Sequence, residues 1–132
     1  VSTLVANAKN QIELVYPFLA RKKTACSSVF FVDIRDIREL WKEGKIENSF
    51  HAPRGMLEFW ADPSSPYYKK FFTLNKSYIL YCASGWRSAL GAYTLKQMGF
   101  TNVLSLKGGL NKWKKCELPT VSVEKTSLTK SS

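Results

Sequence analysis

The chain of 132 residues has few cysteines, few acidic residues and no long apolar run, and each scarcity excludes a class of protein. Its three cysteines, Cys26, Cys82 and Cys116, cannot all pair within one chain, and their spacing contains no C-x-x-C pair. A disulfide framework and a structural zinc site are therefore not expected, and a reducing compartment, the cytoplasm, is favoured. We expect no metal and no cofactor.

The apolar runs are too short to span a membrane, and the first residues lack the basic-then-apolar pattern of a secretory signal peptide. We therefore expect no membrane partner. Because the sequence starts at Val1 rather than at a methionine, a processed or trimmed precursor stays open.

Twenty Lys and Arg residues against ten Asp and Glu residues give the chain a net charge of +10. Clustered cations could bind nucleic acid by neutralising phosphates, but these lysines are scattered as singles and pairs, and no nucleic-acid motif accompanies them. We expect no nucleic-acid partner. Positive potential near a site would instead raise the encounter rate with a small anionic substrate.

Composition and periodicity predict one domain over residues 1–119. The hydrophobic share of 45% is enough for a single buried core. Apolar spacing predicts a helix over residues 4–20, ended by Pro17, that packs on this domain. Residues 120–132 are rich in Ser, Thr and Lys and are expected to form a disordered polar tail.

Short apolar runs alternate with segments of helical spacing along the rest of the chain. The predicted strands cover residues 29–33, 78–81 and 103–106. The predicted helices cover residues 36–41, 88–98 and 108–113, with Gly44 and Gly99 as stops and shorter helical turns within 56–60 and 67–72. Strands alternating with helices imply crossover connections, so the fold class is α/β, with a mainly parallel sheet flanked by helices on both faces.

The most informative segment is the loop that follows the second predicted strand. That strand ends at Cys82, and a helix begins near Arg87. If the loop closes onto the helix N-terminus, the backbone N–H groups point inward and the helix dipole adds positive potential, which suits an anion. The loop residues are Ala83, Ser84, Gly85, Trp86 and Arg87. A cysteine placed there ionises more easily and becomes a nucleophile, and ligand sites in such sheets lie at the carboxyl ends of strands.

Several segments, in order along the chain, resemble the motifs of the rhodanese-homology domain, a sulfurtransferase family. Residues 32–35, 39–41 and 44–46 resemble its Asp-x-Arg strand end, acidic-aromatic helix and Gly-His-Ile turn, although Lys45 replaces the usual histidine. Residues 49–54 and 103–113 resemble its Ala-x-x-Ile-Pro segment and its closing strand with Gly-Gly and Trp. The match covers about Val29 to Trp113, and it implies a central five-stranded, rhodanese-like sheet.

The resemblance implies sulfur transfer through a persulfide on Cys82. A small anionic sulfur donor such as thiosulfate gives up its outer sulfur, and cyanide, a cellular thiol or a protein acceptor then removes it. Arg87 would bind the donor's sulfonate or orient the loop. Arg54 and Trp60 are candidates for the substrate pocket, and Trp86 for its mouth.

Other conspicuous side chains have structural interpretations. Asp33 and Arg35 are expected to form an ion pair or hydrogen-bonded pair that supports the end of the first predicted strand. His51 is the only histidine, but an already ionised thiolate needs no base, so we expect a structural role. Cys26 and Cys116 are likewise expected to be structural.

Two alternatives stay open at this point. The chain could be a non-catalytic rhodanese-like binding module, although inactive members of the family typically lack the cysteine. It could instead be a phosphatase or arsenate reductase, which uses a similar loop. The spacing of Cys82 and Arg87 is C-x4-R, one residue shorter than the C-x5-R loop that encloses phosphate, so a single sulfur fits the tighter ring better.

Overall fold

The computed structural model describes residues 1–125 and builds them around one sheet. The sheet has five strands in the order β1-β5-β4-β2-β3, and every neighbouring pair is parallel. The strands are β1 (Glu13–Val15), β2 (Val29–Asp33), β3 (Phe50–His51), β4 (Ser77–Tyr81) and β5 (Val103–Leu106). The α-helices are α1 (Ser2–Gln11), α2 (Pro17–Lys23), α3 (Ile37–Glu43), α4 (Leu57–Ala61), α5 (Trp86–Gln97) and α6 (Gly109–Lys115), with a 3₁₀ turn η1 (Arg54–Met56).

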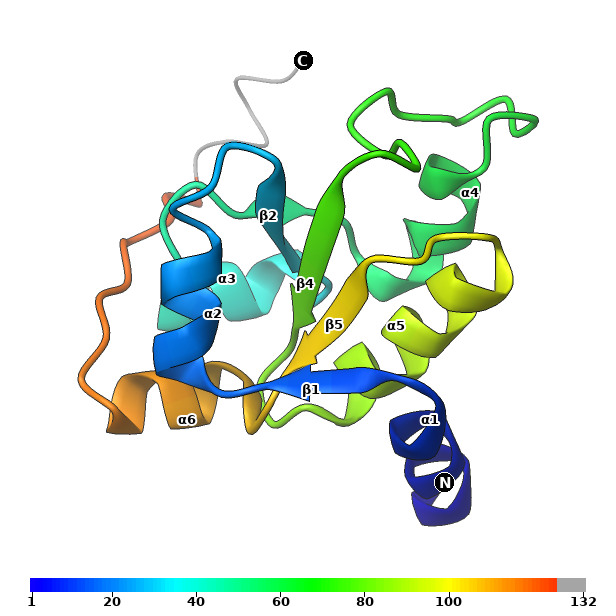
Figure 1. The fold of residues 1–132 in the computed structure, drawn as a ribbon. Coiled ribbons are helices and arrows are strands. Elements are labelled where there is room, and N and C mark those ends of the chain that lie inside the picture. The colour runs from blue at the N-terminus through cyan, green and yellow to red at the C-terminus, as the bar shows by residue number, and fades with distance from the viewer. Residues whose placement is uncertain (126–132) are drawn as a thin grey trace.

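Helices cover both faces of the sheet, as the alternation of strands and helices predicts (Figure 1). One apolar cluster places α4 and α5 against one face, and α1 packs on α5 there. A second cluster joins α2 and α6 to the other face. The strands β2 and β4 therefore lie in the middle, buried on both sides, which explains their nearly continuous apolar sequences.

The N-terminal segment differs from the single predicted helix over residues 4–20. It forms α1, then the edge strand β1, then α2. Pro17 begins α2 rather than ending a helix, because the first helical position needs no N–H donor and suits the fixed φ of proline. Residues 13–15 pair with β5, and Lys107 N–H donates to Val15 O at 2.8 Å, so sheet hydrogen bonds outweigh the local helical spacing. The helical turn expected within residues 67–72 is also absent there, where the chain forms other turns.

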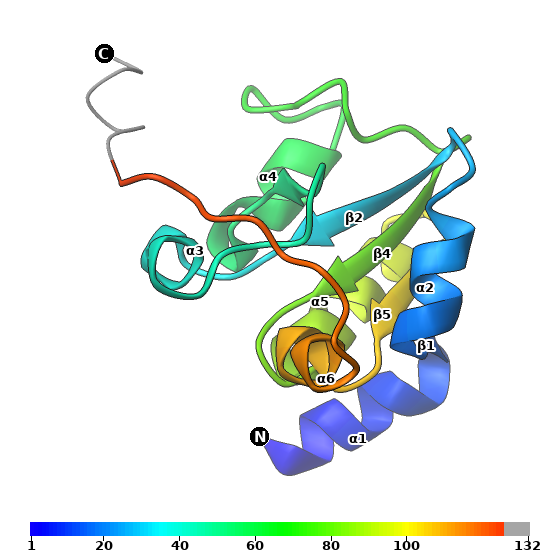
Figure 2. The same cartoon turned by 90° about the vertical axis from the view of Figure 1, so that its left-hand side faces the viewer.

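The C-terminal segment packs back on the domain beyond the predicted end at residue 119. Val121 and Lys45 exchange two backbone hydrogen bonds of 2.8 and 2.9 Å in an antiparallel bridge. Figure 2 shows this segment running from α6 across the molecule towards α3. Of the predicted tail over 120–132, residues 126–132 lie outside the described residues, and the part before them includes this bridge.

Helix α3 is well defined at both ends. The Asp36 side chain accepts from Arg38 N–H, and the Glu39 side chain accepts from Asp36 N–H, which completes a capping box. Gly44 ends the helix with φ of 76°, a backbone conformation that L side chains rarely adopt. The cap fixes Glu39 at the start of α3, close to the carboxyl end of the sheet.

No helix within residues 1–125 combines the length and apolar character needed to cross a membrane.

Candidate active site

Cys82 directly follows β4, and the loop after it runs into α5, as the sequence predicts. Gly85 caps α5 with φ of 106°, a conformation that an L side chain rarely adopts. The short loop therefore turns back at once, and the first turn of α5 begins at Trp86. This brings the helix N-terminus, with its free N–H groups, towards the cysteine.

The Cys82 sulfur faces two backbone N–H groups and one side-chain hydroxyl. Gly85 N–H donates to Cys82 Sγ at 3.2 Å, and Ser88 N–H donates to it at 3.4 Å. The thiol contacts Ser88 Oγ at 3.6 Å. Cys82 is 1% exposed, so these protein dipoles take the place of solvent around the sulfur. An arrangement of this kind favours negative charge on sulfur, both on a thiolate and on a persulfide.

Helix α6 supports the loop from behind. Leu110 N–H donates to Cys82 O at 2.8 Å, and Asn111 N–H donates to Ala83 O at 3.0 Å. Gly109 makes this approach possible, because a Cβ on it would lie 2.5 Å from Cys82 O and 2.6 Å from Ala83 O. The second glycine of the Gly-Gly pair is therefore required by the close packing of α6 on the loop.

Arg87 reaches from the start of α5 to α3. Its guanidinium forms two hydrogen bonds with the Glu39 carboxylate, of 2.7 and 2.9 Å. These bonds lower the pKa of Glu39 below its ordinary value. They also raise the pKa of Arg87, to which the negative charge of a Cys82 thiolate adds. The Arg87 side chain is 41% exposed, and its guanidinium has N–H donors beyond the two that bind Glu39.

Asp33 and Arg35 form a buried ion pair at the carboxyl end of β2. Arg35 Nη2 lies 2.6 Å from Asp33 Oδ2 and also donates to Gly44 O at 2.7 Å. His51 Nε2 lies 2.7 Å from Arg35 O, so the histidine belongs to this assembly rather than to the loop. Burial raises the pKa of Tyr81, whose hydroxyl donates to Ser49 Oγ and accepts from a backbone N–H.

Arg54 and Trp60 have other partners than the cysteine loop. Arg54 pairs with Glu58 at 2.7 Å and contacts Thr94 Oγ1 at 3.3 Å. Trp60 packs edge-on against Phe50 and carries a lysine ammonium 4.7 Å above its ring. Within residues 1–125, no hydrogen bond or ion pair joins either of them to the loop. Their pocket role stays a prediction. Trp86, 45% exposed, stands at the start of α5 beside the loop.

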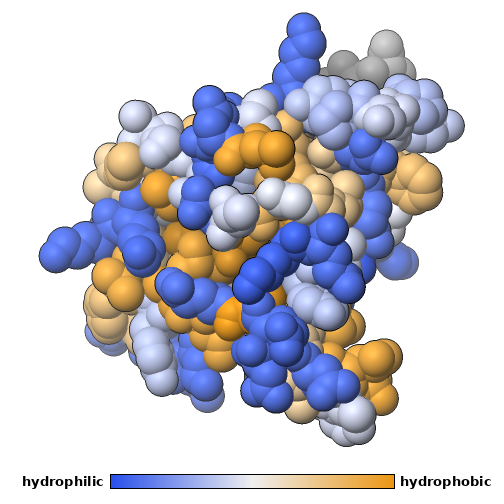
Figure 3. All heavy atoms as spheres, turned by 45° about the vertical axis from the view of Figure 1, so that its right-hand side comes forward, coloured by the Kyte–Doolittle hydropathy of each residue, from blue (hydrophilic) through white to orange (hydrophobic). Residues whose placement is uncertain are grey.

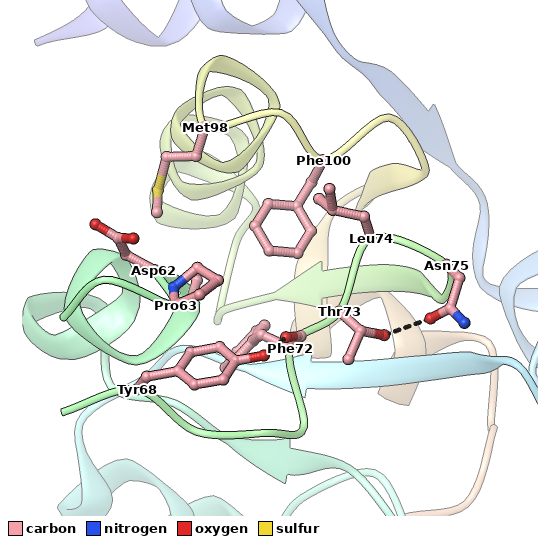
Figure 4. A pocket seen from close by; sticks show the side chains of 10 residues that line it. Asp62, Pro63, Tyr68, Phe72, Thr73, Leu74, Asn75, Met98 and Phe100 are labelled. Carbon is pink, nitrogen blue, oxygen red and sulfur yellow. Dashed lines mark hydrogen bonds between the residues drawn. The ribbon is translucent and has the colours of Figure 1, made fainter. Parts of the chain in front are cut away.

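Two cavities differ in position and character. One of about 710 Å³ is lined by apolar side chains such as Phe72, Leu74, Met98 and Phe100 (Figure 4). These residues precede β4 or β5, so this cavity lies at the amino ends of the strands, opposite Cys82. Figure 3 shows apolar surface among hydrophilic side chains on the side that carries α1, α4 and α5. A second cavity of about 160 Å³ adjoins the loop at Gly85 and has lysines among its lining residues.

Comparison with known proteins agrees with this geometry. The family described as "Rhodanese-like domain" matches residues 18–116, most of the chain. The chain belongs to this family. A sulfurtransferase of Allochromatium vinosum is 28% identical over 106 residues, covering 80% of this chain and 91% of that protein.

Two solved structures resemble this rhodanese-like domain. One, from Rhodopseudomonas palustris and described as a protein of unknown function and possible tyrosine phosphatase, is 42% identical, with a TM-score of 0.86 and coverage of 91% and 92% of the two chains. The other is the polysulfide-sulfur transferase homodimer of Wolinella succinogenes, 28% identical, with a TM-score of 0.74 and coverage of 92% and 86%.

The structure of this rhodanese-like domain places three residues at the site that were not predicted from the sequence as functional candidates. Glu39 holds Arg87, Ser88 contacts the sulfur, and Ser105 lies behind Ser88. Glu39 could have been identified from the sequence, because it stands in the acidic-aromatic motif. Ser105 could also have been identified, because it is the polar residue of an otherwise apolar strand.

In the part of the chain that the structure describes, no group of three or more His, Cys, Asp or Glu side chains is placed to hold a metal ion.

Proposed function

We propose that this rhodanese-like domain is a sulfurtransferase that moves a sulfane sulfur from a small anionic donor to a thiophilic acceptor through Cys82. The observation that supports this most directly is a pair of hydrogen bonds at the sulfur. Cys82 Sγ accepts from two backbone N–H groups, at 3.2 and 3.4 Å, within a C-x4-R loop. Relatives named as sulfur transferases support the same chemistry.

In the first step, Cys82 accepts a sulfur atom from the donor. The Cys82 thiolate attacks the outer sulfur of thiosulfate and forms an S–S bond with it. The original S–S bond of thiosulfate breaks, and sulfite leaves with the electron pair. Cys82 then carries a persulfide whose terminal sulfur is negative. Donors already aimed at the loop interior stabilise that charge without rearranging during the reaction.

In the second step, an acceptor removes the terminal sulfur of the persulfide. A nucleophile, which is cyanide, a cellular thiolate or a protein thiolate, attacks the terminal sulfur. The new bond forms as the persulfide bond breaks, and Cys82 regains its thiolate. Cyanide thereby becomes thiocyanate, and a thiol acceptor becomes a persulfide. No oxidant, metal or other cofactor is needed for either step to balance.

Arg87 has the geometry for a donor contact in the first step. Glu39 holds the guanidinium in one orientation, and the N–H groups that Glu39 does not bind can hydrogen-bond a sulfonate oxygen.

A phosphatase is the second candidate, favoured by the description of the Rhodopseudomonas palustris structure as a possible tyrosine phosphatase. The loop argues against it. A tetrahedral phosphate must fit inside the ring of N–H groups, and C-x4-R is one residue shorter than the phosphatase loop.

The test measures competing reactions on one purified preparation: thiocyanate formed from thiosulfate and cyanide, hydrolysis of p-nitrophenyl phosphate, and reduction of arsenate. We expect only the first, with saturation in thiosulfate. Phosphate ester hydrolysis or arsenate reduction without thiocyanate would replace this proposal with the second candidate. A folded protein inactive with thiosulfate and other sulfane donors would overturn it in favour of a binding module.

A further inference from the structure

Ser105 is a buried polar residue on the strand beside the cysteine loop. It is 0% exposed and stands in β5 between Leu104 and Leu106. Its neighbours Leu104 and Leu106 belong to the cluster under α2 and α6, so the alternation of a strand turns Ser105 to the opposite face, under α5. A hydroxyl buried without a hydrogen bond destabilises the fold, so its partner matters.

That partner is a second buried hydroxyl. Ser105 Oγ and Ser88 Oγ lie 2.8 Å apart, and within residues 1–125 this is the only hydrogen bond of the Ser105 hydroxyl. Ser88, also 0% exposed, places the same oxygen 3.6 Å from Cys82 Sγ and 3.2 Å from Gly85 O. The two serines and the cysteine therefore form a short chain of polar atoms that leads from β5 to the sulfur.

The hydrogens of this chain can be counted. Each hydroxyl has one hydrogen to donate and two lone pairs to accept with. When Cys82 is a thiol, the S–H donates to Ser88 Oγ, and Ser88 donates to Gly85 O. When Cys82 is a thiolate, Ser88 can turn its hydrogen to the sulfur, provided that it is not already donating to Ser105. This condition holds when Ser105 is the donor of the pair.

We propose that Ser105 is a positioning residue for Cys82: its hydroxyl donates to Ser88 Oγ and so keeps the Ser88 hydrogen available to the charged sulfur. The proposal rests on the proposed function only in that it assigns Cys82 a thiolate and a persulfide. A hydrogen bond to the charged form favours that form, and a donor behind Ser88 polarises its hydroxyl and strengthens the bond.

Other groups around the sulfur are the same in every variant below. Arg87 from α5 interacts with the Cys82 charge and is itself paired with Glu39 from α3. From α6, the neighbouring contact is the uncharged backbone N–H of Leu110, which binds Cys82 O. A change in the titration of the sulfur after substitution at Ser105 is therefore assigned to the hydroxyl.

The decisive variants are Ser105→Val and Ser105→Thr, which have nearly the same shape and differ in a methyl group against a hydroxyl. Valine is preferred to alanine because Ser105 lines the small cavity beside the loop. The smaller alanine side chain would leave space that a water molecule could enter, and valine fills that space. Ser49→Ala is the matched control, because Ser49 is a buried serine that hydrogen-bonds Tyr81 instead of the loop. Circular dichroism and thermal unfolding establish that each variant is folded, and Ser105→Ala replaces the valine variant if that one is not.

The readout is the pH dependence of alkylation of Cys82 by iodoacetamide, followed by peptide mass spectrometry so that Cys26 and Cys116 do not interfere. We expect Ser105→Val to raise the midpoint of this profile by about 0.3 to 0.6 pH unit, and so to slow alkylation below the midpoint about twofold to fourfold. Ser105→Thr should restore the wild-type midpoint, and Ser49→Ala should leave it unchanged.

An unchanged or lowered midpoint in Ser105→Val would overturn the proposal, since it would mean that Ser88 donates to Ser105 or that the serine is only structural. Equal shifts in the valine and threonine variants would also overturn it. The outcome is separate from the proposed function. A shifted midpoint in a protein that transfers no sulfur leaves the positioning role intact, and sulfur transfer with no shift removes only that role.

Discussion

The two ends of the sheet differ in how they are built. At the carboxyl end, the loop of Cys82 is held by many short polar contacts: backbone N–H groups reach its sulfur, α6 binds its carbonyls, and Arg87 ties it to Glu39. At the amino end, the cavity of about 710 Å³ is lined by apolar and aromatic side chains. The carboxyl end therefore has oriented hydrogen-bond donors and little free volume. The amino end has a larger free volume and mainly apolar walls.

This difference explains why we place the reaction at the tightly packed carboxyl end and not at the larger cavity. A reaction that develops charge on sulfur needs dipoles fixed in advance, and these need close packing rather than space. The loop has them because glycines allow the backbone of α6 and of the loop to approach. The larger cavity has mainly apolar walls, and two of its polar side chains, Thr73 and Asn75, hydrogen-bond each other. We therefore expect substitutions around the cysteine loop to reduce sulfur transfer strongly, and a substitution on the wall of the larger cavity to leave it unchanged.

The largest effect should come from Cys82→Ser, which replaces the nucleophile with a hydroxyl of similar size. Sulfur transfer should be abolished, because serine is far less acidic than cysteine and forms no persulfide. Thiocyanate formation and thermal unfolding are to be measured together. Cys26→Ser is the matched control, since Cys26 is exposed at the other end, and it should keep the wild-type rate. Transfer by Cys82→Ser would sink the assignment of the nucleophile.

Gly109→Ala should be the next most harmful change. Its Cβ would meet backbone atoms of the loop at 2.5 and 2.6 Å, and its φ is 60°. We expect a loss of about 2 to 4 kcal/mol in the free energy of unfolding, measured with urea, together with reduced transfer. Gly99→Ala is the control, because Gly99 has φ of 103° but open space around it. It should lose about 1 kcal/mol through strain alone and keep the activity of the folded protein. Equal losses in both variants would contradict the close approach.

Glu39→Gln tests the link between α3 and the loop through its pH dependence. Pairing with Arg87 lowers the pKa of Glu39, so the pair contributes stability above the ordinary glutamate pKa, and this contribution is lost as pH falls through the lowered value. The partly exposed pair should contribute about 0.5 to 1 kcal/mol at neutral pH. Urea unfolding should show this difference between wild type and variant shrinking in acid.

The control for Glu39→Gln is Glu43→Gln, on the same helix, whose carboxylate pairs with Lys114 rather than with the loop. Only the Glu39 variant should require more thiosulfate for half-maximal rate, because Arg87 loses its anchor. A stability difference that grows in acid would have the wrong sign for this pair.

The smallest effect is expected at the amino end. Leu74 lines the larger cavity and is 63% exposed. Leu74→Ser should change the free energy of unfolding by no more than about 0.5 kcal/mol and leave the rate of sulfur transfer unchanged. A marked fall in transfer by this folded variant would mean that the two ends of the sheet are coupled.

The sequence predicts the central part of the fold well because burial on both faces leaves a strong signal. Strands β2, β4 and β5 are short apolar runs, and the loop position of Cys82 follows from the end of β4. The edge strands β1 and β3 leave almost none. β3 has two residues, and β1 continues a helical spacing that only its pairing with β5 breaks.

Contacts between distant segments set the rest of the site. The spacing of residues predicts a loop that binds an anion, but not that Arg87 meets Glu39 across 48 positions, or that Ser88 meets Ser105 across 17. Pro17 shows the same limit, since a proline can end one helix or begin another and only the neighbouring strand decides. Pairings of this kind depend on the order of the strands, which local pattern does not contain.

The most direct test of sulfur transfer through Cys82 is the mass of the intact, reduced protein after mixing with thiosulfate, with the modified site mapped by peptide analysis. We expect one added sulfur on Cys82, removed by cyanide with release of thiocyanate. A folded protein in which thiosulfate and other sulfane donors leave Cys82 unmodified, while iodoacetamide still alkylates it, would show that Cys82 is not the sulfur carrier.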